Sequence, residues 1–223
     1  MTADAVFQRA RRPEQKRQRQ EAILDAARQL AIQKGVRNVT LTDIAARVGI
    51  HKSALLRYFE TREQIFLELT ADGWREWAQT LSADLDRVRT GAADAVADIL
   101  ASSFAERPLL CDLIAHTALN LERHASVLAV RKYKLTSLGA VGDAANAVQR
   151  TLPNLTAEES QELIATIASL AGALWQIANP PSALAELYAS DRQLSSACVE
   201  LAPRLRRTAL ILLAGLIATQ TKP

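Results

Sequence analysis

Long stretches rich in alanine and leucine, interrupted by few helix-breaking residues, restrict the fold of this chain more than any other feature. The 223 residues include only 8 glycines and 7 prolines, and aromatic residues make up 4%. Alanine and leucine favour helices, whereas strands favour β-branched and aromatic residues. No run alternates Val, Ile or Thr with polar residues as a strand does, which argues against a β-sandwich, a barrel and a doubly wound sheet. Because 49% of the residues are hydrophobic, the sequence predicts an all-α protein with a packed core.

Positive charge is concentrated at the N-terminal end. Residues 1–62 hold 13 Lys and Arg against 6 Asp and Glu, a net charge of +7, whereas residues 63–223 hold 14 against 18, a net charge of −4. A basic head on a mildly acidic body indicates that the head binds a polyanion and that the body has a different task.

The first part of the chain is expected to fold into three helices. An apolar stripe predicts one helix from Pro13 to Lys34, which Gly35 ends. Thr40 and Asp43 form a capping-box pattern that begins a short helix, and Gly49 ends that helix because glycine tolerates a positive φ. Another short helix is expected from Lys52 to about Phe59. Two short helices around a glycine-containing turn, braced by a longer helix, describe a helix-turn-helix.

The rest of the chain is expected to be helical as well. Thr61 and Thr156 are suited to cap helices, and prolines separate the segments. The expected helices span residues 62–89, 91–106, 108–122, 125–150, 156–178 and 203–219, with a short helix near residues 183–189. The chain therefore divides into a basic, flexible N-terminal arm (1–13), a helix-turn-helix domain (14–62) and a C-terminal domain (63–223).

Other classes of protein find little support in the sequence. Cys111 and Cys198 form no paired motif, so a reducing, cytoplasmic setting is expected. The apolar run Thr208–Thr219 is shorter than the roughly 20 residues that a membrane span needs. The three histidines and the acids show no metal-ligand or catalytic motif, and no phosphate-binding loop is present. We therefore expect no enzyme activity, no cofactor and no metal.

A family resemblance is carried by residues of the head. The stretch Thr40-Leu41-Thr42-Asp43-Ile44-Ala45-Ala46-Arg47-Val48-Gly49-Ile50 is followed by Leu55, by Tyr58-Phe59 and by Arg62-Glu63-Gln64-Ile65. At this spacing the segment resembles the DNA-binding head of the tetracycline-repressor (TetR) family of bacterial transcription regulators, over about residues 15–66. The resemblance implies that residues 63–223 form a ligand-binding and dimerisation domain. Departures at His51, Ser53 and Leu56 bear on which operator sequence is read.

The second short helix is expected to enter the major groove of DNA, where base edges are distinguishable. Its exposed face offers His51, Lys52, Ser53, Arg57 and Tyr58, and Lys52 is the choice for a guanine edge. The alternatives are that His51 only caps the helix and that Tyr58 belongs to the core.

Further DNA contacts are expected from outside that helix. Thr40 and Arg62, like Tyr58, are placed for phosphates, and Arg17 and Arg19 add phosphate or minor-groove contacts from the arm. The family resemblance adds Thr42 as a residue that reaches bases. For each charged residue the alternative is a solvated surface charge.

The C-terminal domain is expected to form a homodimer, because one head buries too little surface for specific binding. Two heads about 34–36 Å apart then read a palindrome. Apolar seams on the expected helices 156–178 and 203–219 would pair across the dyad; the alternative is an internal core. The seam residues are Leu163, Ile167, Leu170, Leu174, Leu205, Ile211 and Leu216.

The resemblance implies a small-molecule effector that binds among residues 91–150 and releases DNA by favouring another conformation. The sequence does not identify the effector. The candidate contacts are Phe104, Leu113, His116, Asn120, Tyr133 and Trp175, with ordinary core or surface positions as the alternative. A repressor is the expected function, since occluding a promoter suffices. An activator and a helical adaptor that binds no DNA are the alternatives.

Overall fold

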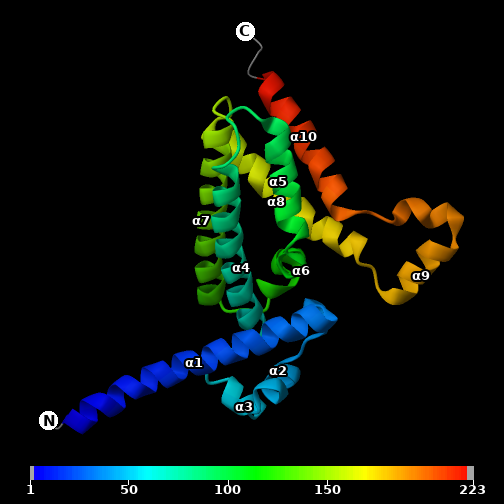
Figure 1. Ribbon diagram of the computed structural model, residues 1–223. Helices are drawn as coiled ribbons and strands as arrows, with labels where there is room; N and C mark the ends of the chain where they lie inside the picture. The colour runs from blue at the N-terminus through cyan, green and yellow to red at the C-terminus, as the bar shows by residue number, and fades with distance from the viewer. Residues whose placement is uncertain (1–2, 220–223) are drawn as a thin grey trace.

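The computed structural model describes residues 3–219, and this part of the chain is helical with no strand. A long first helix lies across one end of a bundle of helices, and two short helices pack beneath it (Figure 1). The head comprises α1 (Ala3–Lys34), the 3₁₀ turn η1 (Val36–Asn38), α2 (Leu41–Val48) and α3 (Lys52–Leu55).

The body is built on α4, which runs from the head into the bundle beside α7, while α5 packs against α10 (Figure 1). Helices α8 and α10 also contact each other. The body elements are α4 (Arg62–Leu85), α5 (Ala93–Ala105), α6 (Pro108–His116), the π-helical turn η2 (Thr117–Leu121), α7 (Val127–Thr151), α8 (Ala157–Ala178), α9 (Ser182–Ser190), the 3₁₀ turn η3 (Arg192–Ala197) and α10 (Leu201–Thr219).

The expected caps of the head helices are present. Thr40 Oγ1 accepts the N–H of Asp43 at 3.2 Å, and the carboxylate of Asp43 accepts the N–H of Thr40 at 2.8 Å. Gly49 ends α2 with φ of 72°, in the left-handed region. Thr61 Oγ1 accepts the N–H of Gln64 at 3.1 Å and so begins α4. The helix-turn-helix predicted from the sequence is confirmed.

Helix boundaries differ from the expected ones at several points. The helix expected from Pro13 begins at Ala3, because α1 also includes a preceding segment with three alanines and three arginines, which are good helix formers. The helix expected to reach Phe59 ends at Leu55, because the chain turns to bury Phe59, which is 2% exposed. The helix expected over residues 108–122 divides into α6 and η2.

The body core is centred on two tryptophans of α4. Trp77 stacks on Phe104 with ring centroids 4.8 Å apart, and its indole N–H donates to Ser103 Oγ at 3.0 Å. The indole N–H of Trp74 donates to the hydroxyl of Tyr133 at 3.3 Å. These buried aromatic contacts join α4 to both α5 and α7.

Helix α6 lies close to two neighbours at glycines. A Cβ added at Gly73 of α4 would lie 3.0 Å from Leu110 Cδ1. A Cβ added at Gly172 of α8 would lie 2.9 Å from Ile114 Cγ2 and 3.0 Å from the backbone nitrogen of Ala115. Because glycine has no side chain, α6 can pack this closely between α4 and α8.

The head is tied to the body through Asp112 of α6. Its Oδ2 accepts the N–H of Val36 at 2.8 Å, and its Oδ1 accepts the side-chain amide of Gln176 at 2.7 Å. Burial raises the pKa of Asp112, but hydrogen bonds from His116, Val36 and Gln176 outweigh burial and keep the pKa below its ordinary value. Asp112 is therefore held as a carboxylate where η1, α6 and α8 meet.

Among the described residues, no single helix is both long and apolar enough to cross a membrane. The bent pair formed by α8 and α9 passes that test only when its two helices are taken together.

The close approach at Gly172 predicts the cost of a substitution. Gly172→Ala forces α6 and α8 apart and is expected to lower the free energy of unfolding by roughly 1–3 kcal/mol, as overpacking does. Gly142→Ala, in α7, is the matched control because nothing lies within 4 Å of its added Cβ. The control is expected to be neutral or stabilising, by up to about 1 kcal/mol. Denaturant unfolding measures both, and equal stability of the two variants would contradict the packing described.

Candidate nucleic-acid interface

Helix α3 begins at a histidine cap, and its first turn presents polar side chains to solvent. His51 Nδ1 accepts the N–H of Ser53 at 3.3 Å and lies 2.8 Å from Ser53 Oγ. The cap considered as an alternative role for His51 is therefore present. Because Nδ1 accepts, the neutral ring carries its proton on Nε2, which remains a donor.

The remaining surface of α3 and the turn after it divides into core and exposed residues. Leu55 is fully buried, whereas Lys52 and Arg57 are exposed and make no ion pair among the described residues. Tyr58 is half-buried and packs against the core. Two cationic side chains thus remain available on the exposed face.

A basic groove of about 710 Å³ lies where α1 passes the end of α3. Its cations are Lys16, Arg19 and Arg57, and Tyr58 also lines it, with no acid among its lining residues. Phosphate oxygens suit such a surface. The structure brings together Arg19, Arg57 and Tyr58 of the predicted residues. Lys16 was not among the predicted residues, although its spacing of three residues from Arg19 places it on the same helix face.

Arg17 lies outside this groove. Its guanidinium pairs with Glu14 at 2.8 Å and with Glu21 at 3.3 Å, both on α1. Its positive charge is therefore balanced along the helix, unlike the charge of Arg19.

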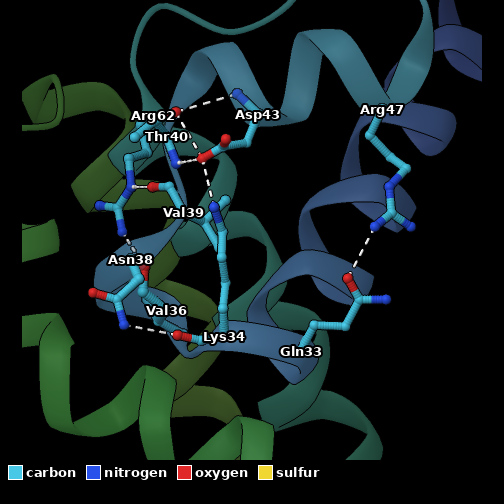
Figure 2. Close-up of polar contacts among 9 residues, drawn as sticks. All are labelled: Gln33, Lys34, Val36, Asn38, Val39, Thr40, Asp43, Arg47 and Arg62. Atoms are coloured by element: carbon cyan, nitrogen blue, oxygen red, sulfur yellow. Dashed lines mark hydrogen bonds and ion pairs between the residues drawn. The ribbon is translucent and has the colours of Figure 1, made fainter.

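The two predicted threonines at the start of α2 have different surroundings. Thr42 is exposed, whereas the Thr40 hydroxyl takes part in the cap and donates to Asp43 at 2.7 Å. Lys34, 2.8 Å from Asp43, and the Thr40 hydrogen bonds lower the pKa of Asp43 to about 2. These contacts fix the start of α2 against the end of α1 (Figure 2).

Arg62 is turned towards the protein. Its guanidinium donates to the carbonyl oxygens of Val36 and Val39 (Figure 2). Its Nη1 also lies 2.9 Å from Glu63 Oε1. The guanidinium also lies 4.6 Å from the centre of the Phe66 ring, and the side chain is 16% exposed. Arg62 therefore joins α4 to the segment that leads into α2. A phosphate contact requires a side chain that faces solvent, and the guanidinium of Arg62 does not face solvent in this structure. A positive charge in the first turn of a helix interacts unfavourably with the helix dipole. An arginine at this position is therefore a hint in the sequence that its charge is compensated by another contact, although it does not identify the partners.

The six predicted ligand contacts do not share one cavity. Phe104 and Tyr133 are buried in the aromatic contacts of the body core. Leu113 borders a cavity of about 320 Å³ between α1, α4 and α6. His116 and Trp175 line a groove of about 680 Å³ between head and body, and His116 and Asn120 line a neighbouring cavity of about 320 Å³.

The predicted dimer residues fall into two sets. Leu163, Ile167 and Leu205 are buried within the chain itself, so they pack in its own core. The other four lie at the surface to different degrees: Leu170, Leu174 and Leu216 are half-buried and Ile211 is 62% exposed. An amphipathic pattern alone did not separate the inner from the outer face of these helices.

Comparison with known families assigns the head and the body separately. Residues 23–69 match the family described as bacterial regulatory proteins, tetR family. Residues 71–220 match the family described as tetracyclin repressor-like, C-terminal domain. The chain therefore belongs to the TetR family of transcription regulators. No curated protein matches the chain.

Solved structures share this architecture at low sequence identity. The fatty acid degradation regulator FadR from Bacillus halodurans is 15% identical, with a TM-score of 0.55, and the match covers 88% of this chain and 95% of that one. FadR from Bacillus subtilis, solved with stearoyl-CoA, is 16% identical, with a TM-score of 0.51 and coverages of 86% and 96%. A transcriptional regulator from Rhodococcus sp. Rha1 is 18% identical, with a TM-score of 0.51 and coverages of 92% and 99%. At these identities the similarity establishes the fold.

The inward position of Arg62 predicts a loss of stability when its donors are removed. Arg62→Met keeps an apolar stem over Phe66 but leaves the carbonyl oxygens of Val36 and Val39 without the guanidinium. The free energy of unfolding is expected to fall by roughly 1–3 kcal/mol, the usual cost of unsatisfied buried polar groups. Arg57→Met, on the exposed face, is expected to leave stability unchanged. Thermal and denaturant unfolding compare the two, and equal stability would show that the Arg62 contacts contribute nothing.

Proposed function

We propose that this TetR-family protein is a transcriptional repressor that binds a palindromic operator as a homodimer and is released by a small-molecule effector. The observation that carries the proposal is the exposed first turn of α3, where Lys52 has no ion-pair partner in the described part of the chain. The basic groove formed with α1 is lined by Arg57 and Tyr58, which lie just after the end of α3.

Base contacts are assigned to the first turn of α3. Lys52 extends from this turn into solvent and suits the O6 and N7 acceptors of guanine. His51 Nε2–H and the Ser53 hydroxyl lie on the same turn, and exposed Thr42 adds a hydroxyl from the start of α2. These short side chains suit contacts close to the helix.

Phosphate contacts are assigned to the basic groove. Lys16 and Arg19 of α1 lie across the groove from Arg57 and Tyr58, so a backbone that passes along the groove meets three cations and a phenol. Such contacts fix the position of the head on the duplex without reading sequence. Arg62 acts here as a brace for the head, and Thr40 acts as a helix cap.

Dimerisation is assigned to the outer faces of α8 and α10. Ile211 is 62% exposed and Ile177 is 49% exposed, and half-buried Leu170, Leu174 and Leu216 lie on the same two helices. Large exposed apolar side chains on neighbouring helices favour association with another surface. A second copy of the chain supplies such a surface by two-fold symmetry and also provides the second head that a palindrome requires.

Release by an effector is supported by the direct bond between head and body. Asp112 joins η1 to α6 and α8, and cavities border this junction. An effector acts on DNA binding by the difference between its affinities for the two head positions. FadR from Bacillus subtilis, which shares the fold, was solved with stearoyl-CoA bound, which supports a ligand-responsive body.

The proposal predicts different effects for base and phosphate contacts. Lys52→Ala is expected to cost roughly 1–3 kcal/mol on the best duplex and to relax the preference at one base position of each half-site. Arg57→Ala is expected to weaken binding to all duplexes and to reduce the slope of log affinity against log salt concentration by about 1 per head.

Fluorescence anisotropy over a series of salt concentrations measures both effects. Arg131→Ala is the matched control, since Arg131 is an exposed cation of α7 with no ion pair among the described residues. Unchanged affinity and unchanged salt slope in both head variants would refute the assignment.

A further inference from the structure

The groove of about 680 Å³ follows the junction between head and body. Its head wall is the end of α1 together with η1, and its body wall is formed by α6 and the end of α8. The polar and aromatic residues that line it are Lys34, Arg37 and Asn38 from the head, and Asp112, His116, Trp175, Gln176 and Asn179 from the body. The neighbouring cavity of about 320 Å³ shares Arg37 and His116 with it, so these two side chains border both spaces.

The charges around this groove favour an anion. Arg37 is exposed and makes no ion pair or side-chain hydrogen bond among the described residues, whereas Lys34 is paired with Asp43. Asp112 is the only acid that lines the groove; its oxygens accept the N–H of Val36 and the amide of Gln176, and His116 Nε2 lies 3.4 Å from its Oδ1. An incoming anion therefore meets an unpaired guanidinium, while the one carboxylate of the groove is engaged by donors of the protein.

The apolar part of the groove favours a flat molecule. Trp175 is half-buried, and Pro180, Pro181 and Leu109 line the same space. The indole of Trp175 presents a flat apolar face, against which a planar ring packs well, and the prolines and Leu109 add apolar surface around it. Small-molecule sites combine such walls with a few placed polar groups.

We propose that this groove binds a small planar organic anion, with the anionic group between Arg37 and His116 and the ring against Trp175. The inference rests on the proposed function and extends it, because it gives the chemical class of the effector and places the effector at the junction of head and body. Of the contacts predicted from the sequence, Phe104 and Tyr133 are buried in core packing, whereas His116 and Trp175 line this groove.

The position of the groove also gives a route to the head. A ligand that contacts Arg37 and His116 at once has an affinity that depends on the separation of η1 and α6. It also places a negative charge beside Asp112, which opposes the carboxylate that holds the N–H of Val36. Ligand binding therefore favours a head released from α6, and DNA binding and ligand binding oppose each other reciprocally.

Benzoate is the probe, and benzamide is its neutral isostere. Isothermal calorimetry measures the affinity, and the three tryptophan indole N–H signals in a nitrogen–proton correlation spectrum report the position of the ligand. Benzoate is expected to bind saturably, at least about fivefold more tightly than benzamide, as a charge-assisted hydrogen bond requires. It is expected to shift the signal that Trp175→Phe removes, while the signals of buried Trp74 and Trp77 stay in place.

Arg37→Gln is expected to weaken benzoate binding about fivefold or more, by loss of the same charge-assisted hydrogen bond. Arg131→Gln, another exposed and unpaired arginine in the described part of the chain, is the matched control and is expected to change nothing. Thermal unfolding shows that both variants are folded. Equal affinity for benzoate and benzamide, undiminished binding by Arg37→Gln, or shifts confined to Trp74 and Trp77 would each overturn the site.

Operator affinity is measured separately on the same preparations, with and without saturating benzoate. Weaker operator binding by the parent chain, but not by Arg37→Gln, supports the coupling. Unchanged operator affinity at saturation overturns the coupling and leaves the binding site standing. A chain that binds benzoate but prefers no duplex contradicts the proposed function and not the site.

Discussion

The guanidinium of Arg62 holds the segment from which the two short helices of the head begin. It donates to the carbonyl oxygens of Val36, in the 3₁₀ turn η1, and of Val39, just before α2. Without the guanidinium, the Val36 carbonyl keeps the 3.4 Å hydrogen bond from the N–H of Val39 but loses its second donor, and these partly buried carbonyl groups would favour other backbone conformations. Because Thr40 follows Val39 directly, this contact also fixes the cap from which α2 starts, and the orientation of α3 follows from α2.

The same segment connects the head to the body. Val36 offers its carbonyl oxygen to Arg62 of α4 and its N–H to Asp112 of α6, so one residue of η1 is tied to two body helices. Any movement of α6 relative to α4 must strain or break one of these bonds. The head–body junction is therefore a place where a ligand can change the position of α3 without touching it. The close packing of α6 at Gly73 and Gly172 limits how much of that movement the body absorbs.

Local signals made the head predictable from the sequence. The capping pair Thr40 and Asp43, the left-handed Gly49 and the cap Thr61 each act within a few residues, and the structure confirms all of them. The inward turn of Arg62 was not predictable in this way, since its carbonyl partners lie 23 and 26 residues earlier in the chain. Its place at the start of the helix that follows the helix-turn-helix suggested a phosphate contact instead.

The helices of the body could be predicted from the sequence, but it was harder to predict which of their side chains pack in the core and which face a ligand or a partner. Phe104 and Tyr133 are aromatic residues of the kind that line ligand pockets. In the structure, however, Phe104 stacks on Trp77 and the Tyr133 hydroxyl accepts the indole N–H of Trp74, so both belong to the core. Leu163 and Ile211 both belong to apolar seams, and only the packing of α8 and α10 shows that one is internal and the other exposed. Helical periodicity gives the faces of a helix and leaves open which face meets the same chain and which meets a partner.

The most direct test of the account is selection of bound duplexes from a random-sequence DNA library by the purified full-length chain. If two copies each present one α3 to the major groove, the recovered sequences are inverted repeats with half-site centres about 34–36 Å, or a multiple of one helical turn, apart. Recovery of no enriched sequence, or of a single site without internal symmetry, would contradict the account.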